Sequence, residues 1–211
     1  MIFNLHSHSF SDEGIQITQN DFFIKTDQIF SVGIHPWNAK EYDLYKTQLM
    51  GLIQSENCLA IGEIGLDKLK GPALELQVEI FKKQITLSEQ YQLPVIIHCV
   101  KAWNELKFLK RNIKPSQPWI FHGFSKIGII DEVLNEGIYV SFGHRIMKDQ
   151  KLLEAAVNIP MEKIFFETDD QPIKIQKIYS TFANAKQISL QELKEIQLEN
   201  FKRVFKKWKS G

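Results

Sequence analysis

Two histidines near the start of the chain, His6 and His8, are separated by one residue and follow the apolar residues of "FNL". Residues two apart on a β-strand point to the same face, so both imidazoles can bind one metal ion. Four further metal-binding side chains each end a different apolar run, namely Glu63, His98, His122 and Asp169. Imidazole and carboxylate groups together are typical ligands of divalent ions such as Zn²⁺ and Mn²⁺.

This set of side chains is larger than one tetrahedral zinc ion requires, which predicts two bound divalent ions (Zn²⁺, Mn²⁺ or Mg²⁺). If Glu63 bridges the ions, they can activate a water molecule and stabilise charge on a phosphoryl or carbonyl oxygen. A single histidine after an apolar run is more often a hydrogen-bonded structural residue. Burying all these groups without pairing or a metal would be costly, however, and this favours a metal site.

The elements that must position these residues are predicted by apolar runs that alternate with amphipathic segments. The runs are "MIFNLH", "GIQIT", "QIFSVGIH", "CLAIGEIG", "PVIIHC", "PWIFHG", "GIYVSFG" and "KIFFETD". They are typical of buried parallel strands in an α/β fold. A TIM-like (β/α) barrel is favoured, because its strands bring their carboxyl ends to one mouth. The chain between His8 and "QIFSVGIH" is too short for two full crossovers, so we expect a trimmed or irregular first β/α unit.

Helix signals are clearest in two segments. Apolar residues repeat at helical spacing over 73–91, and Ser189 with Glu192 has the spacing of a capping box that starts the C-terminal helix. The basic run "KRVFKKWK" near the C-terminus is interpreted as a solvated helix end, with contact to nucleic acid as the alternative.

Length and composition predict a single domain over residues 1–211. The formal net charge of +1 argues against general attraction to a polyanion. Cys58 and Cys99 lie in apolar runs and form no CxxC pair, which is typical of buried, reduced thiols. No basic leader and no apolar run of roughly 18 to 20 residues is present. We therefore expect a cytoplasmic protein with no membrane segment and no obligate protein partner.

Several stretches resemble the TatD-related deoxyribonucleases, a branch of the amidohydrolase-like metal hydrolases. They are "LHSH", "VGIHPW", "AIGEIGLDK", "PVIIHC", "IFHGFS", "VSFG", "FFETDDQP" and "ENFKRVF", in the family's order across almost the whole chain. The resemblance implies a TIM-like barrel that hydrolyses phosphodiester bonds, typically in DNA. It implies a metal site made of His6, His8, Glu63, His98, His122 and Asp169. Glu63 would bridge the ions, and Asp169 would bind metal and orient or deprotonate the attacking water, so both are predicted catalytic residues.

The chain departs from the family pattern in three ways. Asn4 replaces an acid two residues before His6, which predicts weaker support for that ligand. Val100 replaces a basic residue, and Lys101 next to it is expected to take over a phosphate contact. The early part of the chain is also shorter than in typical members, which predicts an opened or reshaped substrate cleft.

The leading functional hypothesis is a divalent-metal-dependent phosphodiesterase or deoxyribonuclease acting on DNA or another phosphodiester. The predicted substrate-binding residues are His35, Lys101 and Arg145, in loops expected at the mouth. A solvent-facing arginine at a helix start is the alternative for Arg145. Two other functions remain open: a related hydrolase of an ester or amide bond, and a non-catalytic metal-binding scaffold.

Overall fold

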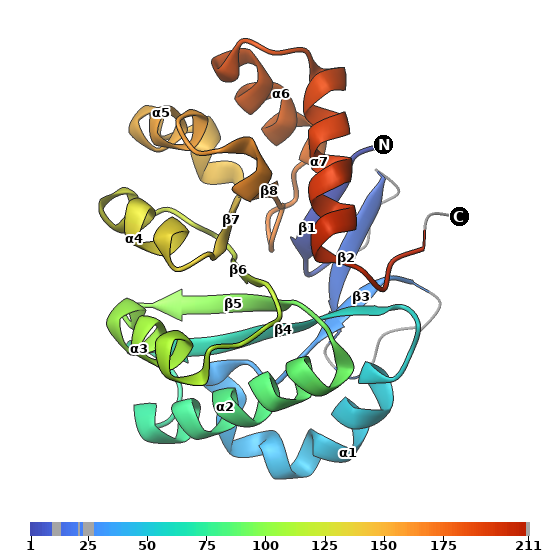
Figure 1. Ribbon diagram of the computed structural model, residues 1–211, viewed down its shortest axis with the longest axis vertical. Coiled ribbons are helices and arrows are strands. Elements are labelled where there is room, and N and C mark those ends of the chain that lie inside the picture. The colour runs from blue at the N-terminus through green and yellow to red at the C-terminus, as the bar shows by residue number, and fades with distance from the viewer. Residues whose placement is uncertain (10–13, 21, 23–27, 210–211) are drawn as a thin grey trace. The chain divides into compact units, whose positions relative to one another are not determined.

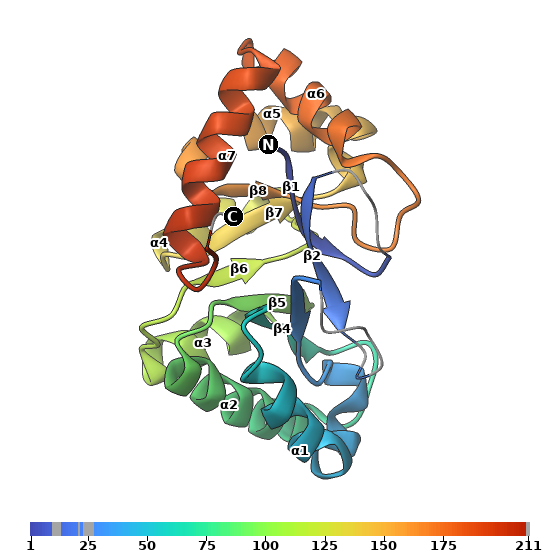
Figure 2. The ribbon, with the colours of Figure 1, turned by 90° about the vertical axis from the view of Figure 1, so that its right-hand side faces the viewer.

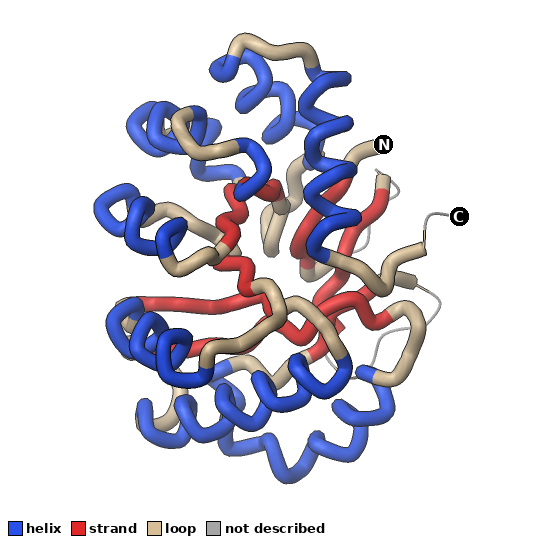
Figure 3. The backbone as a smooth tube through the Cα atoms, in the orientation of Figure 1, coloured by secondary structure: helices blue, strands red, loops and turns tan. Residues whose placement is uncertain are grey.

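Parallel strands and helices alternate along the chain, as the sequence predicted (Figure 3). The computed structural model describes residues 1–9, 14–20, 22 and 28–209. Each predicted apolar run contains a strand, and the strands follow one another in chain order from β1 to β8. The chain divides into a first unit, Met1–Thr18 and His122–Lys206, and a second unit, Gln19–Phe121 and Lys207–Gly211. A single domain over residues 1–211 stays a prediction.

The first unit contains β1, the start of β2, β7 and β8. Its elements are β1 (Phe3–Ser7), β2 (Ile15–Asn20), η2 (Ile127–Ile129), α4 (Ile130–Asn135), β7 (Tyr139–Phe142), η3 (His144–Met147), α5 (Gln150–Val157), η4 (Met161–Lys163), β8 (Ile164–Phe166), α6 (Ile175–Lys186) and α7 (Leu190–Val204). Strand β1 pairs in parallel with β2 and lies against β8, which pairs in parallel with β7. Helix α7 (red in Figure 2) packs beside β1 and β8.

Aromatic side chains fill the core of the first unit. The rings of Phe3 and Phe201 stack with their centroids 4.4 Å apart, which joins β1 to α7. The Tyr179 hydroxyl donates a hydrogen bond to the Phe3 carbonyl (2.8 Å) and accepts one from the Phe3 amide (3.2 Å). Burial raises the pKa of Tyr179 above its ordinary range. The Ser189 side chain accepts the amide of Glu192 at the start of α7, which confirms the predicted helix cap.

The connection from β1 to β2 is short, in agreement with the expected irregular first unit. Residues 8, 9 and 14, which are the described part of this connection, form no helix. Gly14 has φ +92, and a Cβ atom there would lie 2.4 Å from the Ile2 carbonyl oxygen. Only glycine fits this position, and its close approach lets Ile15 donate a backbone hydrogen bond to Ile2 (3.0 Å).

The second unit contains the strands from β3 to β6. Its elements are β3 (Phe30–Val32), η1 (Pro36–Glu41), α1 (Tyr42–Ile53), β4 (Cys58–Asp67), α2 (Leu74–Tyr91), β5 (Val95–Val100), α3 (Trp103–Ile113) and β6 (Trp119–Phe121). The four strands pair in parallel in this order. Figure 1 shows α2 (green) lying along β4, whose residues are all buried. The predicted helix over 73–91 is confirmed by α2.

Both cysteines are free and buried, as predicted. Burial raises the pKa of the Cys58 thiol to about 12. Among the described residues, no helix combines the length and the apolar character that crossing a membrane requires.

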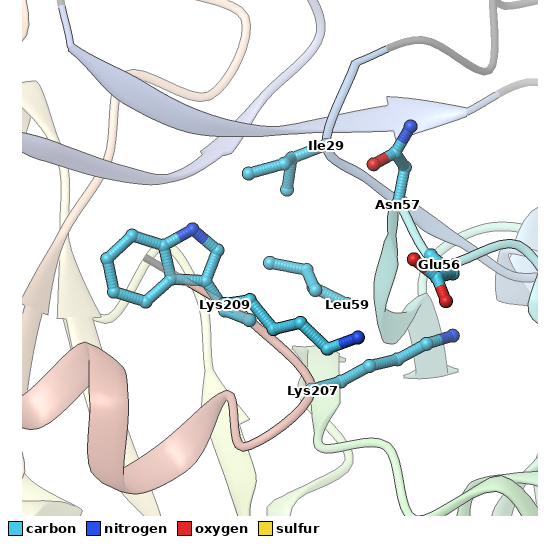
Figure 4. Close-up of a pocket in the computed structure, with 7 residues that line it drawn as sticks. Ile29, Glu56, Asn57, Leu59, Lys207 and Lys209 are labelled. Atoms are coloured by element: carbon cyan, nitrogen blue, oxygen red, sulfur yellow. The ribbon is translucent and has the colours of Figure 1, made fainter. Parts of the chain in front are cut away.

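The basic run near the C-terminus is not one continuous helix end, because α7 stops at Val204. Beyond it, the Lys207 ammonium donates hydrogen bonds to the carbonyls of Ile53 (3.4 Å) and Ser55 (2.6 Å) at the end of α1. A positive charge is favourable there, because helix C-termini carry partial negative charge. Lys207 and Lys209 also line a pocket with Glu56 and Asn57 at the amino ends of β3 and β4 (Figure 4).

Candidate metal centre

The first unit brings together three of the predicted ligands, His6, His8 and Asp169. His6 lies on β1 and is fully buried, and His8 follows the end of the strand. Asp169 Oδ1 lies 3.4 Å from His8 Nε2 and 3.7 Å from His6 Nε2. One ligand atom from each of the three residues lies within 4.8 Å of the others. The two histidines therefore face one carboxylate, which is the arrangement that their spacing suggested.

Backbone hydrogen bonds hold these ligands in register. The Asp169 amide donates to the His6 carbonyl (3.0 Å), and the His8 amide donates to the Asp169 carbonyl (3.1 Å). Asp169 thereby forms an isolated parallel bridge with Ser7 past the end of β8, although its φ is +56. The relative positions of the three ligands are set by the main chain as well as by side-chain packing.

His122 and Glu167 complete what we call the first cluster, which consists of His6, His8, His122, Glu167 and Asp169. The imidazole of His122 lies 4.8 Å from that of His6, between ring centroids, and its Nδ1 lies 3.4 Å from Glu167 Oε1. The Gly123 amide donates a hydrogen bond to the same oxygen. Glu167 is fully buried, and its Oε2 accepts no hydrogen bond from any residue that the structure describes.

The donors of the first cluster fit a divalent cation. Imidazole nitrogens and carboxylate oxygens are the ligands that zinc and manganese use in proteins. A buried carboxylate oxygen without a donor is costly, and a cation beside it would remove that cost. Ligand atoms of His122, Glu167 and Asp169 also lie within 4.8 Å of one another.

Asn4, which replaces the acid of the family pattern, supports the segment that carries Glu167 and Asp169. It is buried, and its amide nitrogen donates to Thr168 Oγ1 (2.8 Å) while its amide oxygen accepts the Thr168 backbone N–H (3.0 Å). The weaker support for His6 that the sequence predicted stays a prediction.

The second unit holds a second cluster, which consists of His35, Glu63, Asp67 and His98. Glu63 and Asp67 lie on β4, His98 lies on β5, and His35 follows β3. His98 Nδ1 lies 2.5 Å and His35 Nε2 lies 3.3 Å from Glu63 Oε1. His35, predicted to bind substrate, therefore lies close enough to Glu63 and His98 to be a ligand as well.

Asp67 is the best-connected carboxylate of the second cluster. Its Oδ2 accepts the indole N–H of Trp37 (2.7 Å) and lies 3.2 Å from His98 Nε2, and its Oδ1 accepts the amides of Leu69 (2.7 Å) and Lys70 (3.1 Å). Burial acts to raise the pKa of Asp67, but these hydrogen bonds, led by that from Trp37, hold it below its ordinary value. The carboxylate is thus stabilised as an anion.

Neither Asp67 nor Glu167 was identified from the sequence. A signal for Glu167 exists, because it lies two residues before Asp169, the spacing that drew attention to His6 and His8. Asp67 lies four residues after Glu63 in the same buried run, and its polar character at the end of β4 was the available signal.

The two predicted cationic substrate contacts lie outside both clusters. Lys101 is exposed and directly follows β5. Arg145 lies in the 3₁₀ helix η3, is exposed, and donates a hydrogen bond to Ser125 Oγ (3.3 Å). Their roles stay predictions.

Comparison with known proteins places these features in context. Residues 14–206 match the sequence profile described as TatD related DNase. The chain is 29% identical over 165 residues to a TATDN1 homolog of Vairimorpha ceranae, covering 75% of this chain and 58% of that protein. It is 30% identical over 203 residues to an uncharacterized metal-dependent hydrolase of Mycoplasma pneumoniae, covering 82% of this chain and 77% of that protein.

Solved structures show the same fold. A TatD homolog from Escherichia coli superposes with a TM-score of 0.85 at 19% identity, over 97% of this chain and 98% of that one. A TatD family hydrolase from Entamoeba histolytica gives a TM-score of 0.78 at 18% identity, over 97% of each chain. With the parallel strands in chain order, this likeness confirms the predicted TIM-like (β/α) barrel class.

Proposed function

We propose, since this chain belongs to the TatD-related DNase family, that it is a divalent-metal-dependent hydrolase of phosphodiester bonds, with DNA as its substrate. The observation that carries the proposal is the first cluster, where a histidine pair and Asp169 share one site with the buried Glu167. One relative is matched over only 58% of its own length, so the activity of this chain rests on its own residues and on direct tests.

The proposed ligands of two divalent ions are His6, His8, Glu63, His98, His122 and Asp169, and Glu63 is proposed as a catalytic carboxylate. The support for this set is chemical, since each side chain offers a nitrogen or oxygen donor beside others of the same kind. When bound, the ions would lower the pKa of water and act as Lewis acids on the phosphoryl group.

Asp169 has the role of orienting the attacking water and accepting its proton. Its side chain is 35% exposed and that of His8 is 40% exposed, so water and substrate can reach both. The backbone hydrogen bonds to His6 and His8 fix the main chain of Asp169 beside both histidines, which supports its position as a general base. Lys101 and Arg145 are proposed to bind phosphate oxygens, and His35 to contact substrate or metal at the second cluster.

Hydrolysis of an ester or amide remains the alternative activity, since the same metal chemistry serves those substrates. The cationic side chains of Lys101 and Arg145 distinguish the two activities. They would strengthen the binding of a phosphodiester, whereas a neutral ester gains little from them. We also propose a cytoplasmic location, which the two free, buried cysteines support.

Metal removal and replacement of the catalytic carboxylates test the proposal. We expect chelation to abolish hydrolysis of a single-stranded DNA oligonucleotide, and added Mn²⁺, Mg²⁺ or Zn²⁺ to restore it. Asp169→Asn and Glu63→Gln should each lower kcat by orders of magnitude with an unchanged circular dichroism spectrum, because these changes remove charge without opening a cavity.

Asp170→Asn is the matched control, because Asp170 is exposed and contacts its neighbour Gln171. It should keep the wild-type rate. Full activity in excess chelator, or wild-type turnover in Asp169→Asn, would refute the proposal. Faster hydrolysis of a neutral ester than of DNA would favour the alternative activity.

A further inference from the structure

Trp37 is a large aromatic side chain that remains exposed beside the second cluster. It lies in η1 directly after His35 and Pro36, and 44% of its surface is exposed. Its ring centroid lies 4.6 Å from that of His35 and 5.9 Å from that of His98. The indole therefore presents rigid ring surface to solvent directly beside a cluster of histidines and carboxylates, where a ligand ring can cover it.

The indole is held in place despite its exposure. Its N–H donates to Asp67 Oδ2 (2.7 Å), and the same carboxylate is fixed by the amides of Leu69 and Lys70. Asp67 Oδ2 also lies 3.2 Å from His98 Nε2, so one buried carboxylate positions both the indole and a proposed metal ligand. A ring fixed in this way loses little conformational entropy when it binds a partner.

The Lys70 ammonium covers one face of the Trp37 ring, and a ligand ring can replace it. The Lys70 ammonium lies 4.4 Å from the ring centroid, and Lys70 is exposed. A cation–π contact at an exposed site is weak, and the lysine side chain is flexible, so a ligand ring can displace it. The displaced ammonium would then be free to bind a phosphate oxygen nearby.

We propose that Trp37 is a platform that stacks on one nucleobase of the substrate, while Lys70 binds a neighbouring phosphate. This inference rests on the proposed function, because it places a base next to the ligands of the hydrolytic site. Every base has a π-face, so such stacking tolerates any sequence, and it requires a base that is not already stacked in a duplex.

Intrinsic fluorescence tests the contact without turnover. With metal removed by chelation, titration with a short single-stranded oligodeoxynucleotide should quench the emission of the wild type. The chain has four tryptophans, of which Trp103 and Trp119 are buried. Trp208→Phe, which removes the other partly exposed indole, should keep the quenching, and Trp37→Phe should abolish it. An abasic oligonucleotide of the same length and charge should leave the wild-type emission unchanged, and equal quenching by it would overturn the stacking role.

Binding and kinetics of Trp37→Ala provide a readout that does not depend on the fluorophore. We expect this variant to bind a dye-labelled oligonucleotide about 5- to 100-fold more weakly, the range expected when one stacked base is lost. The loss in kcat/KM should fall mainly on KM and should be absent with the abasic oligonucleotide. Leu69→Ala is the matched control, since Leu69 is a neighbouring side chain with 68% exposure, and it should bind like the wild type.

The outcomes separate this inference from the proposed function. If the wild type hydrolyses no phosphodiester but Trp37→Ala still binds the base-bearing oligonucleotide weakly, the stacking platform stands and the hydrolytic function fails. If the wild type hydrolyses DNA and Trp37→Ala binds and turns over like Leu69→Ala, the platform is refuted and the function stands.

Discussion

Both units bury carboxylates beside their histidines, and Asp67 in the second unit differs from Glu167 in the first in how its charge is compensated. Asp67 in the second unit accepts hydrogen bonds from the Trp37 indole and from the amides of Leu69 and Lys70. Glu167 in the first unit accepts the Gly123 amide at one oxygen, and its other oxygen accepts no hydrogen bond from the described residues. Fixed donors already compensate the charge of Asp67, whereas Glu167 still requires a positive partner. We infer that Asp67 positions its neighbours and that Glu167 faces a cation.

Glu167→Gln should give the largest effect, a loss of metal affinity, and should distinguish Glu167 most clearly from Asp67. The substitution keeps an acceptor for Gly123 but removes the charge that faces His122, so metal affinity should fall about 10- to 100-fold. The metal-free variant should be at least as stable as the metal-free wild type, because a buried anion without a second donor has been removed. Isothermal titration with Zn²⁺ and urea denaturation of the metal-free proteins measure the two quantities. Unchanged metal affinity would show that Glu167 is only structural.

Asp67→Asn should show the opposite pattern, with a larger effect on stability than on metal affinity. An amide can present its oxygen to only one side, so its NH₂ group would meet either the Trp37 N–H or the amides of Leu69 and Lys70. We expect a loss of about 1 to 3 kcal/mol in the free energy of unfolding, the usual cost of an unsatisfied buried group. Urea denaturation of the metal-free variant checks this, and wild-type stability would contradict the assigned role.

Replacing Glu89 in the second unit should give the smallest change in the free energy of unfolding. It shows how much a partly solvated carboxylate contributes to stability. It accepts hydrogen bonds from Ser116 and from the Gln117 amide ahead of β6. Burial acts to raise its pKa, but these hydrogen bonds hold the pKa below its ordinary value. Glu89→Gln should therefore cost about 0.5 to 1 kcal/mol near neutral pH.

The difference in unfolding free energy between the wild type and Glu89→Gln should change with pH in one definite direction. A carboxylate with a depressed pKa contributes stability above its unfolded pKa and loses it as the pH falls through the folded value. The difference between the wild type and Glu89→Gln should therefore shrink below about pH 4. Urea denaturation at several pH values measures it, and a difference that grows toward acid pH would refute this account.

The strands could be predicted because their runs are mainly apolar, as expected for strands buried on both faces, although buried polar residues such as Asn4 and Ser31 lie within some of them. The length of each strand could not, since "QIFSVGIH" contributes only three residues to β3 whereas "CLAIGEIG" extends to Asp67 in β4. Hydrogen-bond pairing with neighbouring strands sets those limits, and apolar character alone does not report it.

The candidate ligands were found because a histidine or carboxylate at the end of an apolar run is conspicuous, although Glu63 lies within β4 and His98 within β5. The supporting contacts were not accessible from the sequence. The Asn4 side chain meets Thr168 across a separation of 164 residues, and no local pattern encodes a contact of that range. The indole of Trp37 likewise meets Asp67 only through the packing of η1 against β4.

The pairing of β1 with the segment around Asp169 also has a consequence for the order in which the protein matures. His6 and His8 are synthesised more than a hundred residues before Glu167 and Asp169. A nascent chain that has not yet reached Asp169 carries imidazoles without their carboxylates, and the backbone hydrogen bonds that align them cannot form. Closing so long a loop is entropically slow. If the first cluster binds metal as proposed, all of its ligands would be available only after translation has passed β8.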